Sequence, residues 1–120
     1  MERAPKVLSA ETLIGDDVRN SEGEDLGKIE ELMIDIGRGC IAYAVLSFDG
    51  FLGIGDKLFA IPWESLTIDT DEEVFILDVD KETLKDAPGF DRDDWPTAMS
   101  GSDEWLVSVY RYYHHTPYWK

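Results

Sequence analysis

Residues 26–66 read LGKIEELMIDIGRGCIAYAVLSFDGFLGIGDKLFAIPWESL and decide the fold class of this chain. Two apolar runs, 26–36 and 40–48, flank a glycine-rich turn at 37–39, which is the pattern of a β-hairpin. Within the first run the apolar parity changes near Glu30 and Glu31, which indicates a β-bulge of the kind a curved strand needs. Further glycines and a Pro-Trp corner separate the remaining apolar segments into short strands. These features predict a mainly β fold, a small barrel.

The strand expected at 40–48 is apolar on both of its faces. Tyr43 and Val45 point to one side, while the alternate residues, among them Leu46, point to the other. A strand with one face in water should instead alternate apolar with polar residues. The barrel interior covers one face. A second cover is therefore predicted outside the barrel, either the chain's own C-terminal tail or a second subunit.

The chain divides into three parts, an N-terminal lead-in at 1–12, the barrel at 13–80, and an extension at 81–120. Helical turns are expected on either side of the barrel, with Ser9 and Asp80 as their N-caps. The extension begins as an acidic linker, and residues 91–96 show neither helical nor strand periodicity. A short helix is then expected from Asp103 to about Tyr113, because apolar residues recur there at helical spacing. An aromatic tail ends the chain.

These segments together resemble the PRC-barrel domain, over the range from about Leu13 to Val79. The resemblance rests on six elements in order, which are Leu13-Ile14-Gly15, Leu26-Gly27-Lys28-Ile29, Met33-Ile34-Asp35, Tyr43-Ala44-Val45-Leu46-Ser47, the glycine-rich loop, and Ile61-Pro62-Trp63-Glu64-Ser65-Leu66. The family includes the cytoplasmic barrel of the photosynthetic reaction-centre H subunit and a domain of a ribosome maturation factor. This chain lacks the membrane helix of the first and the basic surface of the second, so neither specific function is carried over. The resemblance implies a docking role and supplies no catalytic motif.

Charge and composition narrow the partners that the chain can have. The formal net charge is −15, which repels nucleic acid and anionic lipid surfaces. No apolar run approaches the roughly 20 residues that span a bilayer, so stable membrane insertion is not expected. The sequence does not open with the pattern of a signal peptide, so a cytoplasmic location is expected. The single cysteine, Cys40, is expected to be a small buried hydrophobic residue.

The residues that carry chemistry do not form a catalytic or metal-binding pattern. His114 and His115 are adjacent, so on a helix they point about 100° apart. The acidic run 69–73 lacks the glycine of an EF-hand loop and is expected to be a hairpin turn, and the acids at 91–94 offer too few oxygens for calcium. The sequence therefore predicts a non-enzymatic protein without cofactor or metal.

The predicted function is that of a protein–protein interaction or adaptor module, with a homodimer as the expected assembly and an unknown protein as the partner. An alternative is an acidic-surface, cation-binding or stress-linked regulatory protein. Apolar side chains in the glycine-rich loop and aromatic ones in the tail are the candidate partner contacts, namely Phe51, Leu52, Ile54, Trp105, Tyr110, Tyr118 and Trp119.

Overall fold

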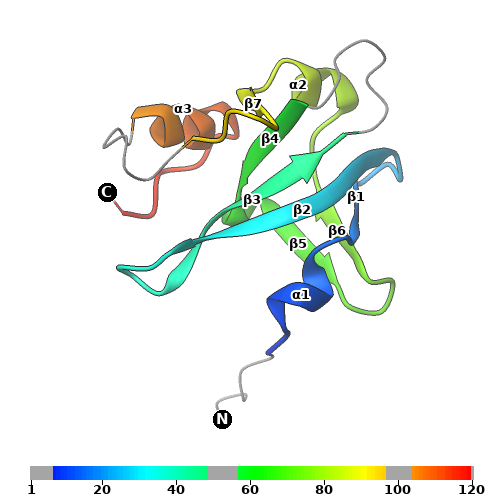
Figure 1. Cartoon of the computed structure of the whole chain (residues 1–120). Helices are drawn as coiled ribbons and strands as arrows, with labels where there is room; N and C mark the ends of the chain where they lie inside the picture. The colour runs from blue at the N-terminus through cyan, green and yellow to red at the C-terminus, as the bar shows by residue number, and fades with distance from the viewer. Residues whose placement is uncertain (1–6, 49–56, 97–103, 120) are drawn as a thin grey trace.

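The computed structural model describes residues 7–48, 57–96 and 104–119, and its main element is one seven-stranded sheet (Figure 1). None of the helices in these ranges is long and apolar enough to cross a membrane. Along the chain the elements are α1 (Ala10–Leu13), β1 (Asp17–Arg19), β2 (Asp25–Asp35), β3 (Cys40–Ser47), β4 (Lys57–Pro62), the 3-10 helix η1 (Trp63–Ser65), β5 (Leu66–Asp69), β6 (Val74–Leu77), α2 (Lys81–Lys85), β7 (Gly89–Asp91) and α3 (Glu104–Tyr112).

The strands follow the order β5-β6-β1-β2-β3-β4-β7. All neighbours are antiparallel except β1 and β6, which run parallel. The sheet curls strongly, and Figure 1 shows β5 and β6 below β2 and β3. Its two edge strands, β5 and β7, are not paired with each other, so the barrel stays open in the described part of the chain. The predicted mainly β fold with a short C-terminal helix is confirmed.

Two irregularities shape the hairpin of β2 and β3. The register shifts between Ile29 and Glu31, which confirms the bulge predicted near Glu30. A second shift lies further toward the hairpin tip, where Ala42 is the extra residue of β3. Because an extra residue changes the side to which the following side chains point, Ile41 does not share the face of Tyr43. This second bulge was not predicted.

The backbones of β2 and β3 lie close together at Gly27. This glycine has φ +123°, and a Cβ built on it would lie 2.0 Å from the carbonyl oxygen of Ser47. No side chain fits there, because real Cβ atoms do not come that close to backbone. The glycine therefore lets the two longest strands cross tightly where the sheet begins to curl.

The predicted second cover of β3 is supplied by the C-terminal part of the same chain. Every residue from Ala42 to Phe48 is buried, which confirms that β3 is covered on both faces. Figure 1 shows α3 beside β4, and Trp105 meets Tyr43 edge-on with ring centroids 5.7 Å apart. The Tyr110 hydroxyl donates a 2.6 Å hydrogen bond to the carbonyl oxygen of Ala42, and the Tyr110 side chain is fully buried.

Both predicted N-caps are confirmed. The Ser9 hydroxyl accepts a hydrogen bond from the amide of Glu11 at the start of α1, and the Asp80 carboxylate accepts one from the amide of Thr83 in α2. The hairpin turn predicted at 69–73 is also confirmed, because β5 and β6 pair on either side of it. These three sites depend on local chemistry, which sequence reading captures well.

Two sequence-based predictions are wrong. Cys40 is exposed rather than buried, because it is the first residue of β3 and lies at the hairpin tip. The expected linker begins within a strand, since β7 pairs with β4 through Asp91. A Cβ on Gly89 would lie 2.7 Å from the carbonyl oxygen of Leu58, so a glycine is needed for this strand to approach β4.

We expect Gly27→Ala to destabilise the fold by about 3 kcal/mol or more, because the new methyl group collides with backbone that cannot move aside. Gly23→Ala is the matched control, since Gly23 also has a positive φ (+85°) but nothing lies within 4 Å of an added Cβ. This control should lower the free energy of unfolding by only about 1 kcal/mol, because the left-handed backbone conformation is the only feature that disfavours a side chain there. Urea unfolding measures both, and equal losses would contradict the close approach of β2 to β3.

Two buried tyrosines of the cover should respond in opposite ways to removal of the hydroxyl group. Tyr110→Phe loses the hydrogen bond to Ala42 and should destabilise the protein by about 1 kcal/mol. The Tyr113 hydroxyl is buried without a hydrogen-bond partner in the described part of the chain, so Tyr113→Phe should be neutral or stabilise by up to about 1 kcal/mol. Urea unfolding of the two variants tests this, and a larger loss for Tyr113→Phe would contradict it.

Candidate functional site

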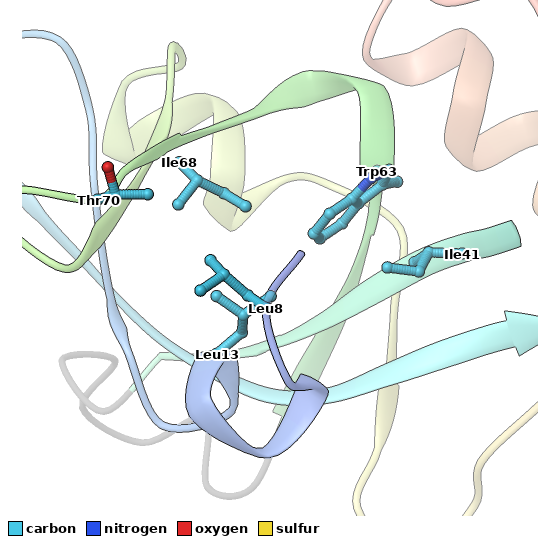
Figure 2. A pocket seen from close by; sticks show the side chains of 6 residues that line it. All are labelled: Leu8, Leu13, Ile41, Trp63, Ile68 and Thr70. Carbon is cyan, nitrogen blue, oxygen red and sulfur yellow. The ribbon is translucent and has the colours of Figure 1, made fainter. Parts of the chain in front are cut away.

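An apolar groove opens at the lower end of the barrel, beside α1. It has a volume of about 400 Å³. Figure 2 shows its side chains converging from α1 and the residues before it, from β3, from η1, and from β5 and the turn after it. Five of the six are apolar, and the complete set is Leu8, Leu13, Ile41, Trp63, Ile68 and Thr70.

Local structure explains why these side chains meet. Leu8 precedes the N-cap of α1 and Leu13 ends the helix, which are the two positions of a hydrophobic staple. The bulge at Ala42 turns Ile41 toward the groove. Pro62 ends β4, and η1 then places Trp63 edge-on to the buried ring of Phe75, with centroids 6.0 Å apart.

The apolar surface continues from the groove onto the β2–β3 hairpin. Ile34 is the cross-strand partner of Ile41, and the side chain of Ile34 is 53% exposed. Leu8 at the groove itself is 44% exposed. Two further large apolar side chains, Val7 and Ile36, are 82% and 92% exposed but do not line the groove.

Carboxylates dominate the elements that form the groove. Residues 7–14, 40–47 and 63–73 contain no Lys, Arg or His, and their acids are Glu11, Glu64, Asp69, Asp71, Glu72 and Glu73. Burial raises the pKa of the nearby Asp16 carboxyl, and the negative charges of Glu73 and Asp17 raise it further. The segments that form the apolar groove therefore carry a net negative charge.

The sequence-predicted tail residues lie on the other face of the sheet, and they contact their own barrel. Tyr110 is fully buried, so this side chain is not available to a partner while the tail is in place. Trp105, Tyr118 and Trp119 are half-buried. Trp105 meets Tyr43 and Phe90, while Tyr118 and Trp119 pack on Tyr110 and on each other.

The end of the tail contacts the side chain of Asp35 on the hairpin. The Tyr118 hydroxyl donates a 2.6 Å hydrogen bond to the Oδ2 atom of Asp35. This bond lowers the pKa of the Asp35 carboxyl below its ordinary value of 3.8, and contacts with Arg38 lower it further. Burial and the acceptor Asp35 raise the pKa of the Tyr118 phenol. We call this contact the Tyr118–Asp35 clasp.

The predicted loop residues Phe51, Leu52 and Ile54 fall outside the described residues. Of the two histidines, His114 is exposed and His115 is half-buried. Within the described ranges, no group of three or more His, Cys, Asp or Glu residues is placed to hold a metal ion.

Sequence reasoning missed the groove. One signal was present, since the spacing of Leu8, Ser9 and Leu13 is that of a staple around an N-cap. That signal places Leu8 against Leu13, but it does not place Trp63 or Ile68 beside them. The groove depends on the curl of the sheet and on the bulge at Ala42, neither of which a periodic pattern reports.

Comparison with known proteins identifies one family. A family model for the PRC-barrel domain matches residues 5–84, which are 80 of the 120 residues. No curated protein matches the chain. The matched range includes every residue of the groove and ends within α2.

The clasp predicts an acid-sensitive component of stability. Because the pKa of Asp35 is lowered by folding, its contribution is complete above the ordinary pKa of 3.8 and is lost as the pH falls through the lowered value. We expect Tyr118→Phe to be less stable than wild type at about pH 7, with the difference shrinking as the pH falls to about 3. Urea unfolding across this range measures it.

Tyr112→Phe is the control for the clasp. The Tyr112 hydroxyl donates to the backbone carbonyl oxygen of Thr83, which does not titrate. The stability difference between wild type and Tyr112→Phe should therefore stay nearly constant over the same pH range. A constant difference for Tyr118→Phe as well would contradict the role of Asp35.

Proposed function

The chain belongs to the PRC-barrel family, and we propose that it is a non-enzymatic docking module that binds a protein partner through the groove between α1, β3, η1 and β5. PRC-barrel domains are generally non-catalytic. The observation that carries the proposal is the open apolar groove itself, in a chain that is otherwise strongly charged.

Exposed apolar surface supports a binding role here. Leu8 and Ile34 stay about half exposed although apolar burial stabilises by about 25 cal/mol per Å². Contiguous apolar patches of this kind on a monomer mark interaction sites more often than scattered single residues do. The groove is also built from several elements of the barrel, so its shape is set before a partner arrives, which lowers the entropic cost of binding.

The homodimer predicted from the sequence is not needed to cover β3. The cover that β3 requires is provided by α3 and the tail of the same chain, so a second subunit is not needed for that purpose. A homodimer stays a prediction, and light scattering at several protein concentrations measures it. The adaptor function does not depend on it, because the groove is complete within one chain.

A double variant, Leu8→Ser with Thr70→Trp, tests the proposal. It removes one apolar wall and places a bulky ring at the groove, and neither residue is buried. Tagged full-length wild type and variant are crosslinked in a lysate of the source organism, and captured proteins are quantified by mass spectrometry. We expect recovery of the partner to fall by about tenfold or more, since burying one leucine is worth about 1.5–3 kcal/mol.

Val7→Ser and Ile36→Ser are the matched controls. Both remove a more exposed apolar side chain that does not line the groove, and both should capture the partner as wild type does. Thermal unfolding of all variants verifies that they fold. Equal capture by wild type, controls and double variant would reject the groove as the docking site, and absence of any captured protein would reject the docking function.

A further inference from the structure

The groove combines an apolar floor with an acidic setting, and this combination has a chemical consequence for the partner. Two of the four wall elements carry carboxylates beside the groove, with Glu11 on α1 and Asp69 ending β5. The turn after β5 adds three more acids in direct succession. On the neighbouring hairpin, the guanidinium of Arg38 pairs with Asp35 at 3.4 Å.

The same charges argue against a second copy of this chain as the occupant. Two copies that met through the groove would bring two acidic settings together, each on a chain of net charge −15. Like charges facing each other cost free energy and slow the encounter, whereas opposite charges steer it. The occupant that complements this surface is therefore cationic around an apolar centre.

We propose that the groove binds a protein segment in which large apolar side chains are flanked by Lys or Arg. This inference rests on the proposed docking function and names the chemistry of its partner. The apolar side chains enter between Leu8, Trp63 and Ile68, and the cationic ones lie over the surrounding carboxylates. Binding weakens with added salt, because exposed charges are screened over about 8 Å at physiological ionic strength.

Two synthetic peptides distinguish the contributions of charge and apolar contact. One carries two repeats of Leu-Lys-Lys-Leu-Leu-Lys-Leu, and the other carries the same leucines with glutamate in place of lysine. Calorimetric titration of the full chain should show binding of the lysine peptide and at least about tenfold weaker binding of the glutamate peptide. Groove variant Leu8→Ser with Thr70→Trp should lose at least about tenfold in affinity for the lysine peptide.

Charge variants show whether binding of the lysine peptide depends on the acids around the groove or on the overall negative charge of the chain. Glu11→Gln with Glu72→Gln should weaken the lysine peptide about fivefold. Glu82→Gln with Asp86→Asn removes the same number of carboxylates from α2 and its C-cap, at the opposite end of the molecule from α1 in Figure 1, and should change affinity less than about twofold.

Each other outcome overturns the inference in a recognisable way. Equal binding of both peptides in the groove rejects the cationic partner while leaving the docking function intact. Binding of the lysine peptide that the groove variant does not weaken, or that both charge variants weaken equally, shows attraction to the whole acidic surface only. A dimer in light scattering that the groove variant converts to a monomer assigns the groove to a second copy instead.

Discussion

The structure depends on keeping water from the outer face of β3 and β4. A barrel of this size encloses only its inner face, yet residues 42–48 are buried on both. The C-terminal helix and tail solve this by packing aromatic rings on the outer face, and the hydrogen bond from Tyr110 to Ala42 places the helix at a defined point of β3. The strand β7 also helps to place this cover, because it pairs with β4 and leads the chain toward α3.

This arrangement divides the apolar residues of the chain into two groups with different roles. The aromatic residues of the tail, although numerous, mostly contact one another and the barrel, so they stabilise the fold. In and beside the groove, by contrast, Leu8 and Ile34 remain open to solvent. Aromatic content alone would point to the tail as the interaction surface, whereas exposure points to the barrel end.

Sequence reading succeeded where the signal was local or periodic. The caps at Ser9 and Asp80, the bulge near Glu30 and the two-faced pattern of β3 each follow from residues close in sequence, and together they predicted the barrel and its need for a cover. It failed where geometry depends on distant contacts. Cys40 has the pattern of its strand but lies exposed at the hairpin tip, as the first residue of β3. The three residues of β7 are too few to show the periodicity of a strand, and the first of them, Gly89, is a residue type that is uncommon in strands.

Sequence reading could not predict the groove either, because its geometry also depends on distant contacts. The charges near the groove explain how an acidic chain can keep an apolar site in solution. The bulge at Ala42 and the curl of the sheet bring Ile41 beside Trp63, which no single segment encodes. The acids that accompany these residues in sequence remain on the surface, since ionised carboxylates are costly to bury. In the proposed binding mode, like charges around an apolar surface disfavour contact between two copies and favour a cationic partner. In the proposed complex, charge selects the partner and apolar contact holds it.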